Sequence, residues 1–267
     1  MKLGASTKSF GGMALVDTAA LFSNSGLCCA ELCFCQTELG GWKYNLSGYE
    51  PLPKLSDAEN AKRIFADFGI VISSVGIYNC LWQGDSEAVA DSLKYFCEYC
   101  DLACGMGVKL ITTHSGTPGF RSDTNKTDRF YGKVFECFVS ALVEAEKRGL
   151  YVAVECSDND ALSDYGDFLR LKEYTEYILG RSNMLKYIGV PVCDGICADN
   201  EDSALFHIKD RKHNGRFFER FGDGDGDFKA FFKSCTPYTD KPVILEYVNS
   251  ANLLDTVGRV RNAATLI

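Results

Sequence analysis

Residues 128–155 read DRFYGKVFECFVSALVEAEKRGLYVAVE and form one helix-to-strand unit. Residues 128–148 have the length and the amphipathic pattern of a long helix, and Gly149 stands where helix ends favour glycine. The apolar run Tyr151–Val154 then predicts a short strand, which ends at Glu155. Helices that alternate with strands in this way indicate parallel strands joined by crossover helices.

The same alternation recurs along the chain. Strands are expected at residues 2–6, 27–34, 70–77, 108–113, 151–154, 187–193, 205–208 and 242–245, and helices at 13–24, 56–68, 85–104, 128–148, 164–179, 228–234 and 253–264. Eight strands with helices between most of them, in 267 residues, match an α/β fold of the (β/α)8 TIM-barrel type that spans residues 1–267 as one domain. A doubly wound open sheet is the alternative, although no G-x-G-x-x-G turn follows the first strand to support a dinucleotide site.

One connection departs from this pattern. Only about ten residues, 195–204, separate the sixth expected strand from the seventh, which is too few for a full crossover helix. Extended chain could still span the height of the barrel, at roughly 3.3 Å per residue. We therefore expect a closed barrel with a shortened connection between its sixth and seventh strands.

Composition restricts the class of partner and the compartment. The net charge is −8 and lysine and arginine form no cluster, which argues against nucleic acid as the main partner. The opening residues MKLGASTKSF show no signal peptide, and no apolar run approaches the length of a membrane span. The 13 scattered cysteines are typical of reduced thiols, so we expect a cytoplasmic protein with no membrane partner. Cys97, Cys100 and Cys104 have helical spacing and are interpreted as the inner face of a helix rather than as a metal site.

Acidic and imidazole side chains stand at the ends of the last four expected strands. In chain order they are Glu155, Asp194, His207 and Glu246. In a TIM barrel the carboxyl ends of the strands meet at the face that carries the chemistry. Three carboxylates alone would repel one another, and a divalent cation such as Mn²⁺, Mg²⁺ or Co²⁺ suits three oxygen ligands and one nitrogen ligand. Zn²⁺ is a further candidate, and each residue taken alone could instead be a helix cap or a salt-bridge partner.

These motifs resemble the xylose isomerase-like TIM-barrel superfamily of sugar and sugar phosphate isomerases and epimerases, over nearly the whole chain. The matching stretches are AELCF with Glu31, VAVE with Glu155, IGVPVCD with Asp194, HIKD with His207, and ILEY with Glu246. The resemblance implies that Glu155, Asp194, His207 and Glu246 hold one divalent metal. It also implies that Glu155 and Glu246 are the catalytic acid–base pair. One glutamate removes a carbon-bound proton to give a cis-enediolate, and the other returns a proton.

Four further residues are expected to contact a small-molecule carbohydrate substrate. By the same resemblance Lys209 lies near the oxygens of the sugar, and Glu31 belongs to the same set. His114, at the end of the fourth expected strand, is a candidate hydrogen-bond partner of the substrate, with loop capping as the alternative. Trp82, like Trp42, lies in a loop at the same rim, where it lines the sugar or packs within the loop. The identity of the sugar, its phosphorylation and the formation of a homo-oligomer stay open.

The GDGDGD loop, residues 222–227, suggests a calcium site, but the pattern does not fit one. With Asp223 as the first ligand, an EF-hand loop needs glycine at the sixth position and glutamate at the twelfth, where this chain has Phe228 and Ser234. No Gly-Lys-Ser/Thr follows, so a phosphate loop is not supported. A flexible acidic turn is the simplest interpretation. The resemblance identifies it as the turn after the seventh strand, with Asp227 as the N-cap of the next helix.

Two departures from the family pattern widen the range of reactions. Cys197 stands where relatives often have a substrate-contacting histidine, and the short connection lies in the same region. They leave room for a metal-dependent lyase or dehydratase acting on an oxidised sugar or inositol. A non-catalytic sugar-binding barrel is a further alternative, although both glutamates are present. An apurinic-site endonuclease on the same fold needs a histidine-rich metal cluster and a basic face, which three histidines and a net charge of −8 do not provide.

Overall fold

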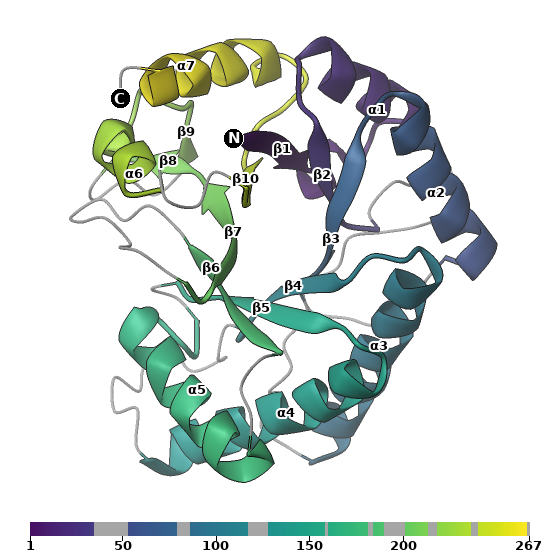
Figure 1. Cartoon of the computed structure of the whole chain (residues 1–267), viewed down its shortest axis with the longest axis vertical. Helices are drawn as coiled ribbons and strands as arrows, with labels where there is room; N and C mark the ends of the chain where they lie inside the picture. The colour runs from purple at the N-terminus through teal and green to yellow at the C-terminus, as the bar shows by residue number, and fades with distance from the viewer. Residues whose placement is uncertain are drawn as a thin grey trace.

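The strands of this protein close into a barrel. The computed structural model describes residues 1–34, 53–78, 86–116, 128–157, 160–180, 184–189, 201–212, 218–235 and 240–265. Parallel strands pair in the order β1-β10-β7-β6-β5-β4-β3-β2, and β2 pairs with β1 to complete the circle (Figure 1). The prediction of a TIM barrel is confirmed, and the open-sheet alternative is wrong.

Each barrel strand overlaps a strand that the sequence predicts. The strands are β1 (Lys2–Ser6), β2 (Cys29–Leu32), β3 (Val71–Ile77), β4 (Leu110–His114), β5 (Tyr151–Glu155), β6 (Leu185–Gly189), β7 (Ser203–Ile208) and β10 (Pro242–Leu245). β6 and β7 are direct neighbours, with residues 190–202 between them. Residues 190–200 of this short connection lie outside the described part of the chain.

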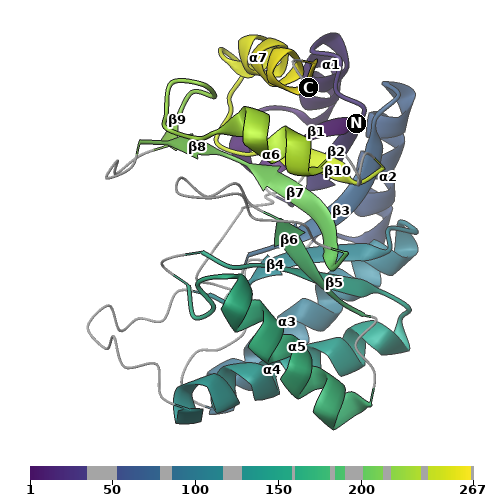
Figure 2. The same cartoon turned by 60° about the vertical axis from the view of Figure 1, so that its left-hand side comes forward.

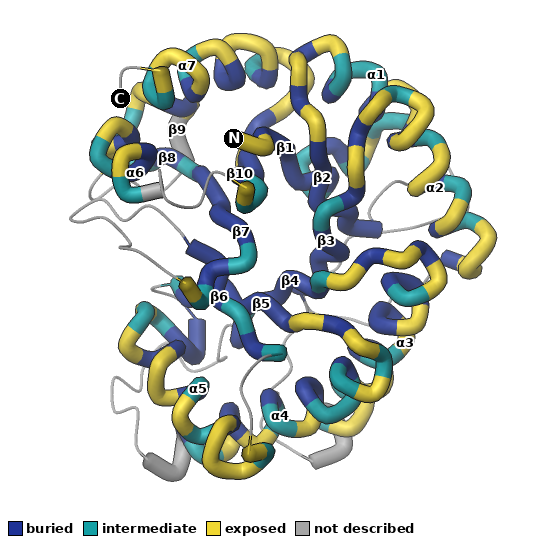
Figure 3. The backbone as a smooth tube through the Cα atoms, viewed as in Figure 1, coloured by how far each residue is buried: buried dark blue, intermediate teal, exposed yellow. Residues whose placement is uncertain are grey.

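Helices surround the barrel and turn their apolar faces towards it. They are η1 (Thr7–Phe10), α1 (Leu15–Asn24), α2 (Leu55–Asp67), α3 (Ser86–Gly105), α4 (Asp128–Lys147), α5 (Tyr165–Leu179), α6 (Phe228–Cys235) and α7 (Leu253–Thr265). Figure 3 shows buried strands inside a ring of helices whose outer surfaces are exposed. On α3, Cys100 is buried and Cys97 and Cys104 are partly buried, as their spacing predicts. Within the described residues, no helix combines the length and the apolar character that crossing a membrane requires.

Local sequence sets the ends of these elements. Asp164 accepts a hydrogen bond from the backbone N–H of Asp167 and so caps the start of α5. Gly180 ends α5 with a φ of 66°, a conformation that glycine adopts without strain. A two-stranded hairpin, β8 (Asp210–Arg211) with β9 (Phe218–Glu219), follows β7 and lies beside α6 (Figure 2). The sequence pattern did not indicate this hairpin.

Side chains inside the barrel form an apolar layer beneath a polar one. The apolar layer is a separate buried cluster made of Cys29, Ala153, Ile188, Leu205 and Ile244. Two positions further along four of these strands stand Glu31, Glu155, His207 and Glu246. Residues two apart on a strand point to the same face. These polar groups therefore lie directly above the apolar layer, at the carboxyl ends of the strands.

Candidate active site and metal centre

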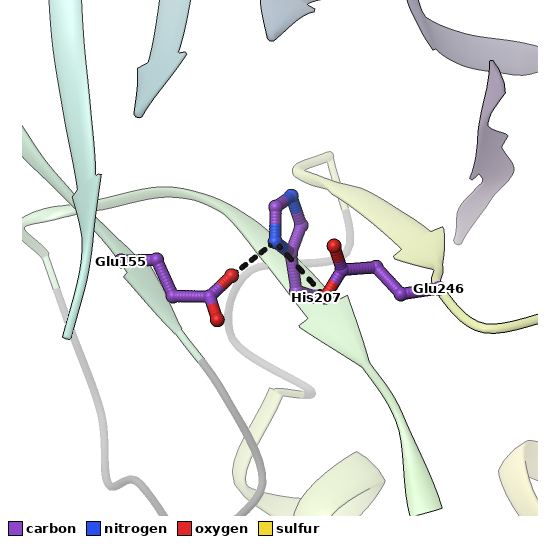
Figure 4. A group of neighbouring side chains, drawn as sticks. All are labelled: Glu155, His207 and Glu246. Carbon is purple, nitrogen blue, oxygen red and sulfur yellow. Dashed lines mark hydrogen bonds and ion pairs between the residues drawn. The ribbon is translucent and has the colours of Figure 1, made fainter. Parts of the chain in front are cut away.

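Glu155, His207 and Glu246 meet at the carboxyl-terminal mouth of the barrel. Glu155 is the last residue of β5, His207 lies in β7, and Glu246 directly follows β10. The Nδ1 atom of His207 lies 2.6 Å from Oε2 of Glu155 and 3.6 Å from Oε2 of Glu246. Figure 4 shows the two carboxylates approaching the same ring nitrogen, Nδ1, from different directions. All three side chains are buried, which strengthens every charge interaction between them.

Both nitrogens of the His207 ring face carboxylates. Nε2 lies 3.1 Å from Oε2 of Glu31, on the side of the ring away from Glu155. Burial alone would lower the pKa of His207, but the charges of Glu246 and Glu31 and the hydrogen bonds to Glu155 and Glu31 raise it to about 10. In the absence of a metal the ring is therefore an imidazolium that donates through both nitrogens at neutral pH.

Lys209 is the second cation of the site. Its ammonium group donates to Oε1 of Glu155 and, at 2.9 Å, to Oε2 of Glu246. Burial alone would lower the pKa of Lys209, but these two carboxylates raise it above its usual range. Burial likewise opposes the charge of Glu155, yet Lys209 and His207 hold the pKa of Glu155 well below its usual range. Glu155 is consequently ionised, in the form that can accept a proton or ligate a metal.

Glu31 lies wholly inside the barrel, with no exposed surface. One carboxylate oxygen accepts from Ser6 and Tyr78, and the other accepts from Thr112 and faces His207. Burial would raise the pKa of Glu31, but His207 and these hydroxyl donors lower it to about 2. Glu31 is thus a buried anion on the opposite side of the His207 ring from Glu155.

His114, at the end of β4, is held by two acceptors of the protein itself. Its Nδ1 lies 3.3 Å from Oδ1 of Asp160, and its Nε2 lies 3.0 Å from the backbone oxygen of Tyr78. Burial would lower the pKa of His114, but the hydrogen bond and charge of Asp160 raise it. Both ring nitrogens are engaged in this way, so contact between His114 and a substrate stays a prediction.

Tyr247 marks the open side of the site. It follows Glu246 with a φ of 55°, a conformation that costs a non-glycine residue energy and is often found at functional sites. Its ring is half-exposed and lies 5.9 Å from the ammonium groups of both Lys8 and Lys209. The Lys8 ammonium also lies 4.5 Å from the ring of Tyr78. Two lysines and two tyrosines therefore border the glutamates.

The side chains at the mouth suit a divalent metal ion. One ligand atom from each of Glu155, His207 and Glu246 lies within 4.8 Å of the other two. Carboxylate oxygens with an imidazole nitrogen are ligands that Mn²⁺, Co²⁺ and Zn²⁺ accept. The Lys209 ammonium already lies against both carboxylates, which shows that this position favours positive charge. These three residues would hold the metal, with Nδ1 of His207 as the nitrogen ligand.

Comparison with known proteins identifies the family. A sequence model described as xylose isomerase-like TIM barrel matches residues 26–264. The chain belongs to the xylose isomerase-like TIM-barrel family. No curated protein matches the chain in sequence. The resemblance that the motifs suggested is thereby confirmed.

Solved structures of this family share the fold over almost the whole chain. An IolI protein with a bound zinc atom has a TM-score of 0.75 at 12% identity and covers 100% of this chain and 99% of that one. A probable 3-DHS dehydratase, AsbF, from Bacillus anthracis has a TM-score of 0.74 at 13% identity and covers 99% of both chains. A D-psicose 3-epimerase from Clostridium cellulolyticum H10, solved with D-tagatose, has a TM-score of 0.73 at 12% identity and covers 100% of this chain and 99% of that one.

A longer protein also contains this barrel. The chain spans 43% of a fusion of a xylose isomerase-like TIM barrel with a 4-hydroxyphenylpyruvate dioxygenase, with a TM-score of 0.72 at 13% identity. At such identities these likenesses establish the fold alone. The structural neighbours include a D-psicose 3-epimerase and a probable dehydratase, so proteins with this fold differ in the reactions that their names describe.

The structure brings most of the expected site residues together. Glu155, His207, Glu246, Lys209 and Glu31 form one contiguous network of hydrogen bonds and ion pairs. The remaining expectations at Asp194, Trp82, Trp42 and Cys197 fall on residues outside the described part of the chain.

Sequence reasoning missed the hydroxyl groups around Glu31 and the rim formed by Lys8 and Tyr247. Ser6 is the last residue of β1, and its position at a strand end could have identified it as a neighbour of the acidic residues.

The GDGDGD loop binds a carboxylate of the same chain. The backbone N–H groups of Gly222 and Gly224 donate to Oδ2 of Asp210 at 2.8 and 3.0 Å, and that of Gly226 donates to Oδ1 at 3.3 Å. A Cβ atom at Gly224 would overlap with Oδ1 of Asp210, so glycine is required there. Asp227 accepts from the backbone N–H of Ala230 at the start of α6, in agreement with its predicted role as N-cap. The loop is therefore a fixed turn around Asp210.

Proposed function

We propose that this protein is a divalent-metal-dependent isomerase or epimerase of a sugar, a sugar phosphate or a related polyol. The observation that carries the proposal is that Glu155 and Glu246, which reach the barrel mouth from β5 and β10, both approach Nδ1 of His207 (Figure 4). Two carboxylates on different sides of one site can serve two faces, or two neighbouring carbons, of the same substrate.

Glu155 and Glu246 exchange the proton in this proposal. One carboxylate removes a proton from a carbon next to a carbonyl, which gives an enediolate. The other returns a proton to the opposite face in an epimerase, or to the neighbouring carbon in an isomerase. A metal held by Glu155, His207 and Glu246, with Asp194 as the predicted fourth ligand, would polarise the carbonyl oxygen and make the neighbouring C–H more acidic.

Lys209 and the rim support this chemistry. The Lys209 ammonium lies against both glutamates, so it favours their ionised, proton-accepting forms. When a substrate enters, the same ammonium is in reach of its oxygens and can stabilise the negative charge that develops on them. The exposed ring of Tyr247 offers an apolar surface beside the glutamates. The fold of an epimerase solved with D-tagatose is consistent with a carbohydrate substrate.

Exchange of carbon-bound hydrogen with solvent tests the proposal. The protein would be loaded with Mn²⁺ and incubated in heavy water with ketoses, ketose phosphates and keto-inositols. After removal of the Mn²⁺, proton NMR would report loss of C–H signals. We expect exchange at a carbon next to the carbonyl. Glu155→Gln and Glu246→Gln should each lower the rate by about 10²- to 10⁴-fold. Glu144→Gln, which alters a glutamate on α4 paired with Lys147 and Arg148, is the control and should leave the rate unchanged.

The outcomes separate the possible reactions. Exchange with recovery of a new epimer or isomer supports the proposal, whereas loss of water with a new double bond would assign a dehydratase. Full exchange by both glutamate variants would refute the role of the pair. Tight binding of a sugar without exchange, in protein that carries its metal, would instead indicate a binding barrel.

A further inference from the structure

The two nitrogens of His207 face carboxylates of different kinds. Nδ1 points to Glu155 and Glu246, which stand at the open mouth of the barrel. Nε2 points inward to Glu31, 3.1 Å away, on the other side of the ring. A neutral imidazole carries a proton on one nitrogen and a lone pair on the other, and the partner of the protonated nitrogen decides which is which. The choice between Nδ1 and Nε2 as metal ligand therefore depends on Glu31.

The carboxylate of Glu31 is held in place by hydrogen bonds to both of its oxygens. Its side chain has no exposed surface. One oxygen accepts from Tyr78 at 2.8 Å and from Ser6 at 3.0 Å, and the other accepts from Thr112 at 2.6 Å. Ser6 lies in β1, Thr112 lies in β4 and Tyr78 directly follows β3, so three parts of the barrel hold the carboxylate. The carboxylate cannot rotate away from His207 without losing several of these hydrogen bonds.

We propose that Glu31 is a positioning residue that keeps the proton on Nε2 of His207 and so leaves Nδ1 free for a metal ion. The proposal rests on the metal centre of the proposed function, because it concerns how one ligand of that centre is oriented. It replaces the substrate contact expected for Glu31, since both of its oxygens already accept from groups of the protein.

Loss of Glu31 should act on the metal through His207. Without an acceptor on Nε2 the ring can exchange tautomers and rotate, so Nδ1 presents its lone pair for only part of the time. Removal of such an outer partner of a metal-binding histidine typically lowers metal affinity by about 10- to 100-fold. The side chains of Glu155 and Glu246 are not altered by this change, so any loss of affinity reports on His207.

Zn²⁺ titration combined with NMR of the histidine rings tests the proposal. The chain has three histidines, so ¹⁵N–¹H spectra of the imidazole rings are simple enough to assign. In the Zn²⁺-loaded wild type we expect His207 to show a protonated Nε2 and a metal-bound Nδ1. Glu31→Ala should bind Zn²⁺ about 10- to 100-fold more weakly and lose the protected Nε2 proton. Glu31→Gln keeps an acceptor oxygen, so it should retain this proton and bind with intermediate affinity.

A buried carboxylate elsewhere provides the control. Asp167 accepts from the Tyr131 hydroxyl and from Ser163, and these contacts do not involve the site. Asp167→Asn should change stability but neither the Zn²⁺ affinity nor the His207 tautomer. If Glu31→Ala does not fold, the test rests on Glu31→Gln. A Glu31→Gln variant with the Zn²⁺ affinity and the imidazole spectrum of the wild type would overturn the proposal.

The remaining outcomes separate the two proposals. A Zn²⁺-loaded wild type that keeps its proton on Nδ1, or equal Zn²⁺ affinity in Glu31→Ala and the wild type, would overturn the role of Glu31 alone. A wild type that binds neither Zn²⁺ nor Mn²⁺ would overturn the metal-dependent function and, with it, the role of Glu31.

Discussion

Replacement of Lys209 by methionine should destabilise the metal-free protein far more than the metal-bound one. The ammonium group contacts both Glu155 and Glu246, and its side chain is only 17% exposed. Removing one partner of a buried ion pair costs about 3–5 kcal/mol, because the opposite charges are left uncompensated. Lys209→Met has nearly the same volume, so the loss of packing adds little. We therefore expect the free energy of unfolding without metal to fall by about 3–5 kcal/mol.

A divalent metal restores the missing positive charge at the same two carboxylates. The destabilisation in the metal-saturated protein should then shrink to about 1 kcal/mol. By thermodynamic linkage, a difference of about 3 kcal/mol between the two states means that Lys209→Met binds the metal roughly 100-fold more tightly than the wild type. If the proposed function holds, the variant should also lose activity, because the ammonium group that we propose to stabilise charge on substrate oxygens is gone.

Urea denaturation with EDTA and with saturating Zn²⁺ measures both quantities, and competition with a chelator gives the affinity independently. Lys172→Met is the matched control, since Lys172 pairs with Asp202 at 2.8 Å on a more exposed part of the surface. It should cost no more than about 1 kcal/mol, equally with and without metal. Equal destabilisation of Lys209→Met in both conditions, or weaker metal binding, would show that the ammonium and the metal do not use the same charges.

Two further predictions concern pH and the GDGDGD loop. The pKa of His207 is about 10 without metal, and the imidazole must lose a proton before it can bind a metal. The affinity for Zn²⁺ should therefore rise about tenfold per pH unit between about pH 7 and pH 9, and binding should release about one proton. Calorimetry in buffers of different ionisation enthalpy measures this, and a flat profile would mean that His207 has an ordinary pKa. Gly224→Ala places a Cβ atom against Asp210 and should lower the free energy of unfolding by about 1–3 kcal/mol. In Gly258→Ala, on α7, the new Cβ atom meets no neighbour within 4 Å, so the free energy of unfolding should rise by up to about 1 kcal/mol. Thermal unfolding compares the two alanine variants, and equal effects would contradict the close packing of the loop around Asp210.

The barrel could be predicted from the sequence because its signals are local. Helical periodicity, glycine at helix ends and short apolar runs each lie within a few residues, as in Gly149 followed by β5. The positions of Glu155, His207 and Glu246 then follow from one general rule, that parallel strands end at the same face. The β8–β9 hairpin could not be predicted, because each of its strands has two residues, which is too few to show an alternating pattern.

The partners of each site residue could not be predicted in the same way. Glu31 and His207 are 176 residues apart and belong to strands on different sides of the barrel. Their contact depends on the closure and stagger of the whole sheet, which no local pattern encodes. The same holds for the hydroxyl of Thr112, which is an ordinary strand residue until the barrel directs it at Glu31. Residue type indicated which groups are chemically able to act, and the fold determined which of them meet.

The stretch HIKD joins the site to the GDGDGD loop. Alternation along β7 and the residues after it turns His207 and Lys209 inward, and Asp210 away from them. Asp210 is then held by three backbone N–H groups of the loop, with almost no exposed surface. Since Asp210 is covalently next to Lys209, a shift of the loop would move the ammonium that lies against Glu155 and Glu246. The glycines that suggested a calcium site therefore help to fix, from outside the barrel, the backbone from which the two cations of the site project.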